Sequence, residues 1–244
     1  MADWNEPRRS QPGFGASPSY GGDLAGRATF DAGLRKHMLS IYNYMASGVL
    51  LTGIIAMLFA RSGMAASVMT SGLGIVLMLS PLAVVFAMSF GANRFSVSTL
   101  RALFWGYAVL MGLSLSTIFL VYTGASIATT FFATAGAFAG LSLYGYTTQK
   151  DLSGWGSFLI MGVIGLLVAS VINIFLQSPA LTWAVSALGV LIFAGLTAYD
   201  TQKLKEQYSY VAGTEWAGKA VVLGALNLYL DFINMFLFLL RFVG

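Results

Sequence analysis

The sequence predicts an all-α integral membrane protein, a bundle of seven transmembrane helices with the seventh helix at its centre. Of its 244 residues, 57% are hydrophobic and 9% are charged, whereas soluble domains average roughly 25% charged residues. The hydrophobic residues form runs of about 20, the length at which a helix crosses the hydrocarbon core, and they lack the alternation of a membrane β-barrel. The last run carries a stripe of polar residues, which predicts its central position.

Seven hydrophobic segments follow a polar N-terminus. Residues 1–30 are rich in Pro, Gly and Ser and contain no hydrophobic run, which predicts a disordered tail ahead of one transmembrane domain, residues 31–244. No signal-peptide core follows Arg8 and Arg9, so we expect the first hydrophobic segment to be an uncleaved anchor. The predicted spans are residues 38–60, 68–90, 98–122, 125–147, 155–176, 180–201 and 218–242.

The connections and the basic residues predict how the spans are arranged. Ser178-Pro179 and residues 122–124 are short connections typical of antiparallel helical hairpins. Eleven Lys and Arg residues fall on the N-terminal side of the spans, and only Arg61 and Arg241 fall on the other. Because positive loops stay in the cytoplasm, we expect a cytoplasmic N-terminus. The eleven are Arg8, Arg9, Arg27, Arg35, Lys36, Arg94, Arg101, Lys150, Lys203, Lys205 and Lys219.

The last hydrophobic segment carries polar side chains along one face. Asn227, Asp231 and Asn234 are spaced i, i+4 and i+7, and Arg241 follows at i+14. Lipid cannot satisfy amide or carboxyl groups, so this stripe should face protein or a water-filled cavity, which places the helix inside the bundle. For the two asparagines alone, hydrogen bonds to neighbouring helices explain the pattern equally well.

A second carboxylate, Asp200, follows about twenty apolar residues and precedes Lys203 by three positions. It is either an interfacial group beside a lysine or a partner of Asp231, since the sixth and seventh spans share a connection. Two close carboxylates share a proton, so the pair would tie two helices when protonated and repel when ionised. Asp231 lies about 18 Å along its helix, counted from Lys219 at 1.5 Å per residue, so contact requires a deeper sixth helix or a tilt.

The remaining composition excludes several functions. With no cysteine there is no disulfide, thiolate metal site or cysteine nucleophile. The single histidine, His37, precedes the first span, so Ser142 has no base and we do not expect an enzyme. The net charge of +4 reflects membrane topology rather than nucleic-acid binding. No resident cofactor is expected; Asp200 and Asp231 could bind calcium only weakly, because Ca²⁺ takes about 6 to 8 oxygen ligands.

Two segments resemble a known family. The sequences AYDTQ (198–202) and LNLYLDFINMFLFLLRF (226–242) are similar to the hallmark segments of the Bax inhibitor-1 family. The resemblance implies a seven-helix bundle around the last helix, a location in a bacterial inner membrane, and a pH-sensitive calcium leak whose sensing pair matches Asp200 and Asp231. The family's latch arginine in the second span has no direct counterpart, since Met88 and Ser89 stand there.

Two arginines beyond the second span, Arg94 and Arg101, are the candidates to replace that latch. The leading hypothesis is a passive, pH-sensitive calcium leak in the lipid bilayer, gated by the aspartate pair. The alternative is a non-conducting membrane protein that modulates a quality-control protease or another membrane complex through its tail or its helix faces. The oligomeric state is left open.

Overall fold

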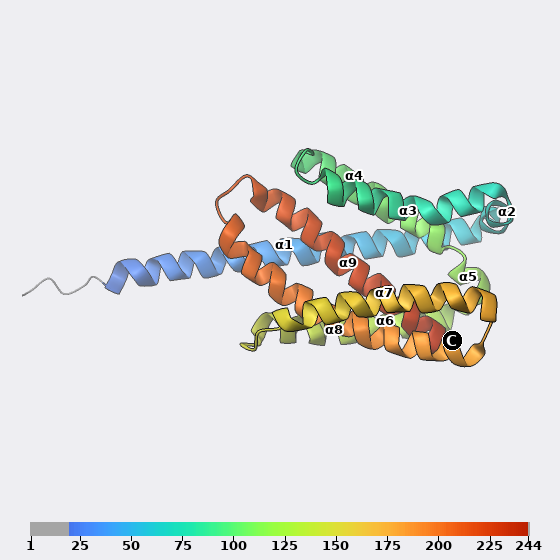
Figure 1. The fold of residues 1–244 in the computed structure, drawn as a ribbon. Coiled ribbons are helices and arrows are strands. Elements are labelled where there is room, and N and C mark those ends of the chain that lie inside the picture. Colours follow the sequence, from blue (N-terminus) through green and yellow to red (C-terminus); the bar gives the residue numbers. More distant parts are fainter. Residues whose placement is uncertain (1–19, 244) are drawn as a thin grey trace, which may run out of the picture.

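The structure, a computed structural model, describes the backbone of residues 20–243 and the side chains from Thr29 onward, Met69 excepted. This part of the chain is helical and contains no strand (Figure 1). Seven helices are long and apolar enough to cross a membrane, α4 and α5 counting as one span, which confirms the predicted fold class. The helices are α1 (Tyr20–Arg61), α2 (Met64–Thr70), α3 (Gly72–Gly91), α4 (Val97–Leu115), α5 (Ile118–Val121), α6 (Gly124–Thr147), α7 (Ser153–Leu176), α8 (Pro179–Val211) and α9 (Trp216–Val243).

Two helices extend beyond their predicted spans. Helix α1 begins at Tyr20, so residues 20–30 of the expected tail are helical, and residues 1–19 lie outside the described residues. Helix α8 continues to Val211, eleven residues past Asp200. The predicted end at residue 201 was therefore too early, because the polar sequence after Asp200 continues as a helix rather than beginning a loop. Asp200 consequently lies well inside α8.

Helix α9 occupies the centre of the bundle. Its hydrophobic window is 61% buried, compared with 11% to 33% for the other six spans. It packs against α8, α1, α6 and α4 (Figure 1). Helices α3 and α7 lie at the periphery, and their exposed apolar side chains, such as Leu79 and Leu167, face the position of lipid. The central position predicted from the polar stripe is confirmed.

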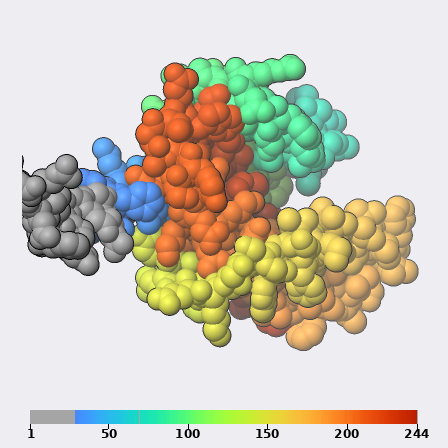
Figure 2. Space-filling model, turned by 60° about the vertical axis from the view of Figure 1, so that its left-hand side comes forward, coloured from blue at the N-terminus to red at the C-terminus, as the bar shows by residue number. Residues whose placement is uncertain are grey.

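The connections lie at two ends of the bundle. The start of α1 and the α3–α4, α6–α7 and α8–α9 connections share one end, here called the N-terminal end (Figure 1). Seen toward that end, the α8–α9 region lies between α3–α4 on one side and α6–α7 on the other (Figure 2). At the opposite end, Gln177 adopts a left-handed conformation and the Ser178 side chain caps α8, which confirms the predicted hairpin.

A close helix contact holds α6 against α8. At Gly145 an added Cβ would overlap the backbone carbonyl of Ala198, so the contact requires glycine. Ala198 begins the AYDTQ segment. The backbone of α6 therefore lies directly beside the part of α8 that carries Asp200.

Candidate functional site

The two predicted acids come together between α8 and α9. Asp231 is buried, with 4% of its surface exposed, and Asp200 is half-buried. Their carboxyl groups are close enough to interact directly. The depth difficulty disappears because α8 continues beyond Asp200 and brings it to the level of Asp231. The acids therefore form one pair on the face of α9 that packs against α8.

A hydrogen bond between the two carboxyl groups would require a proton. The Oδ2 atom of Asp231 is buried and receives no N–H or hydroxyl donor from the described part of the chain. A carboxylate only accepts hydrogen bonds, so a hydrogen bond between two carboxyl groups needs a proton on one of them. Two ionised carboxylates so close together would repel each other in a low-dielectric interior. The geometry fits a pair that holds one proton.

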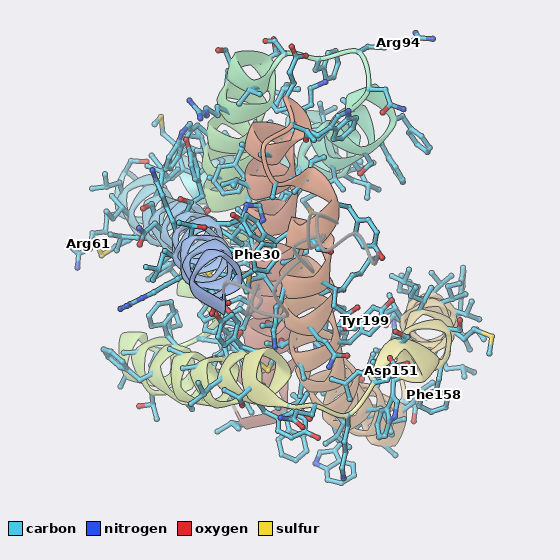
Figure 3. All side chains as sticks on the ribbon, turned by 90° about the vertical axis from the view of Figure 1, so that its left-hand side faces the viewer. Phe30, Arg61, Arg94, Asp151, Phe158 and Tyr199 are labelled. Carbon is cyan, nitrogen blue, oxygen red and sulfur yellow. The ribbon has the colours of Figure 1, made fainter. Side chains whose placement is uncertain are left out.

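A cation, Lys203, lies one turn further along α8 from Asp200. It exerts an electrostatic influence on Asp200, and its Nζ lies 5.7 Å from the ring centroid of Tyr199. Tyr199 and Asp151 lie on the side of the bundle where α7 packs (Figure 3). Lys203 thus stands near the outer side of the pair, as the sequence position suggested, while Asp231 lies on the inner side.

The residues after Asp200 fix α8 to the α6–α7 connection. Thr201 Oγ1 lies 3.1 Å from Ser142 Oγ of α6. Gln202 Nε2 donates to the carbonyl of Lys150 at 2.8 Å, and its Oε1 accepts from the backbone N–H of Leu152 at 2.8 Å. The sequence prediction missed Thr201 and Gln202, although the AYDTQ segment contained them. These bonds hold the helix turn that carries Asp200.

The two asparagines of the predicted stripe lie in different surroundings. Asn227 is exposed, whereas Asn234 is half-buried and its Nδ2 donates to the Leu230 carbonyl of its own helix at 2.8 Å. Only Asp231, between them, is buried against α8. The stripe is therefore not uniformly enclosed in this conformation, and the acid pair is its buried part.

The two candidate latch arginines lie away from the pair. Arg94 is exposed in the α3–α4 connection and extends from the edge of the bundle (Figure 3). Arg101 is exposed on α4, with its guanidinium carbon 6.0 Å from the ring centroid of Tyr44. Neither forms an ion pair with Asp200 or Asp231 among the described residues. Met88, which stands where the family's latch arginine is expected, is fully buried.

A hydroxyl cluster that the sequence did not predict lies on the other side of α9. The Tyr229 hydroxyl donates to Thr52 Oγ1 at 2.6 Å, and Thr52 Oγ1 donates to the carbonyl of Ala108 at 2.8 Å. The Tyr107 ring packs edge-on against Tyr229, with centroids 5.1 Å apart. The Tyr107 hydroxyl is buried and has no partner in the described part of the chain. This cluster joins α9 to α1 and α4.

The acid pair is a poor resident metal site. In the part of the chain that the structure describes, no three histidine, aspartate or glutamate side chains converge. Two carboxylates supply four oxygens, whereas Ca²⁺ takes about 6 to 8. The pair can therefore contact a hydrated cation but cannot enclose it.

Comparison with known proteins identifies the family. The sequence model described as "Inhibitor of apoptosis-promoting Bax1" matches residues 34–244, which is nearly all of the transmembrane domain and includes both acids. The chain belongs to the Bax inhibitor-1 family. The resemblance predicted from the AYDTQ segment and the last helix is thus confirmed. The match leaves out the N-terminal 33 residues.

Bacterial relatives resemble the chain along most of their length. It is 46% identical to the Inner membrane protein YbhL of Escherichia coli, over 87% of this chain and 93% of that protein. It is 49% identical to an uncharacterized protein of Caulobacter vibrioides, over 88% and 90% of the two chains, and 47% identical to one of Rickettsia prowazekii, over 88% and 92%. The chain is a multi-pass membrane protein of the bacterial Bax inhibitor-1 type.

Proposed function

We propose that this protein is a passive, pH-sensitive leak for calcium ions, gated by the Asp200–Asp231 pair. The observation that carries the proposal is the close approach of these two acidic side chains inside a largely apolar bundle. Acidic side chains inside a membrane segment are costly, on the order of 2.5 to 3.5 kcal/mol on insertion scales, and they mark ion paths or proton-dependent switches.

The pair acts as a latch between two helices. With one proton shared, the carboxyl groups hydrogen-bond and hold α8 against α9. When that proton leaves, two negative charges face each other in a medium of low dielectric constant, and the helices separate. Flux should therefore rise with pH through the titration of the pair. Helix α9 is central, so a shift of α8 changes the interior of the bundle rather than its surface.

The ionised pair also attracts the transported cation. Calcium prefers carboxylate and carbonyl oxygens, and a site with few protein ligands leaves water to complete its coordination. Binding must be weak for conduction, since a cation that is held tightly cannot leave. Two carboxylates with Asn234 one turn beyond Asp231 meet this requirement.

We place the protein in the bacterial inner membrane with its N-terminus in the cytoplasm. The N-terminal end of the bundle carries eleven Lys and Arg residues in the sequence, against two at the other end. A protein named as an inner membrane protein is 46% identical to this chain over 217 aligned residues. The acid pair then senses the pH on the side of the α6–α7 and α8–α9 connections.

Calcium flux into liposomes tests the proposal. The full chain and the variants Asp200→Asn and Asp231→Asn are reconstituted, and the flux is measured from acid to mildly alkaline pH. An amide donates a hydrogen bond to a carboxylate without needing a proton, so each variant should stay latched and lose its response to pH. Asp151→Asn, at an exposed loop position, is the control and should keep the wild-type profile. An unchanged profile in both pair variants would refute the proposal.

A further inference from the structure

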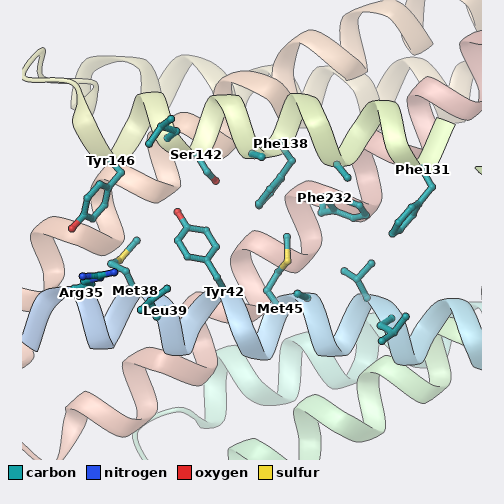
Figure 4. Close-up of a pocket in the computed structure, with 16 residues that line it drawn as sticks. Arg35, Met38, Leu39, Tyr42, Met45, Phe131, Phe138, Ser142, Tyr146 and Phe232 are labelled. Carbon is teal, nitrogen blue, oxygen red and sulfur yellow. The ribbon is translucent and has the colours of Figure 1, made fainter. Parts of the chain in front are cut away.

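A cavity of about 790 Å³ lies between α1 and α6 (Figure 4). Helix α1 packs mainly on α4 and α9, whereas α6 packs mainly on α8 and α9. The two helices are thus separated from each other, and Phe232 of α9 lines the space between them. The volume falls within the range of roughly 300 to 1,000 Å³ that small-molecule ligands occupy in proteins.

The cavity carries a charge at one end, two hydroxyl groups, Tyr42 and Ser142, further along, and is otherwise apolar. Arg35 of α1 and Tyr146 of α6 line its N-terminal end, and the Tyr146 hydroxyl points toward Arg35 (Figure 4). Further along, Phe138, Phe131 and Phe232 line it. This polarity matches a ligand with one polar end and a long apolar chain.

The length of the cavity matches such a chain. Its lining on α1 runs from Arg35 to Leu50, a distance of about 22 Å at 1.5 Å per residue. The hydrocarbon core of a bilayer is about 30 Å thick. One leaflet occupies about half of that thickness, so the cavity is long enough to hold an acyl chain of one leaflet.

The rim of the cavity faces the position of lipid. Leu39, Leu50 and Leu143 line it and are 50%, 63% and 63% exposed. Leucines exposed on a transmembrane bundle contact acyl chains, because the hydrocarbon core contains no water. A lipid chain can enter laterally without crossing a polar barrier.

The charges at the mouth complement a phosphate. Arg35 is exposed and forms no ion pair with a described carboxylate, including Asp31 one turn earlier. Lys36 is the next residue. Lys205 Nζ donates to the Tyr146 carbonyl at 2.8 Å, which brings a further positive charge to this end. Arginine binds phosphate oxygens in a bidentate manner, and basic pockets between transmembrane helices bind lipid head groups.

We propose that this cavity binds one anionic phospholipid, with an acyl chain between α1 and α6 and its phosphate at Arg35. The lipid comes from the leaflet at the N-terminal end of the bundle. The site is separate from the calcium leak, since the proposal concerns binding and holds whether or not the protein conducts. It touches the acid pair only indirectly, because Ser142 lines the cavity and contacts Thr201, the neighbour of Asp200.

Native mass spectrometry of the purified full chain tests this site. Delipidated protein in detergent is titrated with phosphatidylglycerol and with phosphatidylcholine of the same acyl chains. The wild type should bind one phosphatidylglycerol ahead of any further lipid, and phosphatidylcholine more weakly. Arg35→Gln should weaken phosphatidylglycerol binding about fivefold, the effect of one basic residue at an anionic membrane surface. The adjacent Lys36→Gln, which does not line the cavity, should have a smaller effect.

A second pair of variants tests the chain-binding part of the cavity. Ala139 lines the cavity, whereas Ala137 is exposed on the same helix and does not line it. Ala139→Phe should therefore reduce occupancy of the first lipid at least fivefold, and Ala137→Phe should leave it unchanged. Circular dichroism verifies folding, and Ala46→Phe repeats the test from α1 if Ala139→Phe does not fold. Equal phosphatidylglycerol binding by wild type, Arg35→Gln and the cavity-filling variant would overturn the proposal, since the lipids would then form only a non-specific annulus around the protein.

Discussion

The two faces of α9 hold the central helix in different ways. Toward α1 and α4, Tyr229 uses neutral hydroxyls, with a 2.6 Å hydrogen bond to Thr52 and edge-on aromatic contacts. Toward α8, Asp231 meets another acid, Asp200. The two residues are only two positions apart on the helix, so they point in nearly opposite directions. One face thus carries neutral hydroxyls, and the other carries the acid pair to which the proposal assigns the pH response.

This difference suggests a division of roles within one helix. Neutral tyrosine and threonine hydroxyls keep the same hydrogen bonds across the physiological range, because tyrosine ionises only near pH 10 or above. The α1–α4 side can therefore serve as a fixed support while the α8 side moves. The hydrogen bonds of Gln202 and Thr201 would carry any movement of α8 to α6 and to the α6–α7 connection.

Among the variants that compare the two faces of α9, Gln202→Ala should cause the largest loss of stability. The substitution removes both hydrogen bonds to the α6–α7 connection and leaves the Leu152 N–H and the Lys150 carbonyl unpaired. We expect it to cost about 1 to 3 kcal/mol, measured by thermal unfolding in detergent. The control is Gln207→Ala, at an exposed position on the same helix. Equal unfolding temperatures for the two variants would contradict the role given to Gln202.

The neutral side is tested by two tyrosine substitutions of the same chemistry. Tyr229→Phe removes the hydrogen bond to Thr52 and should cost about 0.5 to 1 kcal/mol, the scale of hydrogen bonds inside membrane proteins. Tyr107→Phe removes a buried hydroxyl that has no described partner, so it should be neutral or stabilising. Thermal unfolding in detergent compares the stabilities of the two variants. Both should keep the wild-type pH profile of calcium flux, and a changed profile in Tyr229→Phe would contradict the proposed division of roles.

The smallest effect is expected at Asp151, which lies outside both faces. Hydrogen bonds from the side chain and the backbone N–H of Ser153 lower the pKa of Asp151 below its usual value. A carboxylate with a lowered folded-state pKa contributes stability that is present at neutral pH and is lost as the pH falls through that pKa. Asp151→Ala should therefore lower the unfolding temperature slightly at neutral pH and not at strongly acid pH. A difference that persisted in acid would rule out this titration as its cause.

Much of the fold was predictable from the sequence because lipid imposes length and hydrophobicity on every span. The seven segments follow from these constraints, and the central position of α9 follows from its polar stripe. The length of α8 does not, since the polar sequence from Lys203 onward is equally compatible with a loop. That single error produced the difficulty over the depth of Asp200 and Asp231.

Parts of the candidate site could not be predicted from one sequence. Asp231 was identified from its cost in lipid and Asp200 largely from the family resemblance, and the structure brings them into contact. The partners of Gln202 are backbone groups on another helix connection, and backbone groups carry no signal in the sequence. Tyr107 and Tyr229 look like ordinary core aromatics until their hydroxyls are located. The uneven burial of Asn227 and Asn234 could not be predicted from their spacing, which places both on the same face of the helix as Asp231.

The distance between α8 and α9 as a function of pH tests the central claim most directly. The chain has no natural cysteine, so spin labels can be attached to cysteines introduced at two exposed positions, Gln207 of α8 and Asn227 of α9. Double electron–electron resonance should show a longer distance between the two spin labels at high pH than at low pH in the otherwise wild-type protein. The same labels combined with Asp231→Asn should give the short distance at every pH. A distance that does not change with pH, or one that changes equally with Asp231→Asn present, would contradict the proton-dependent latch.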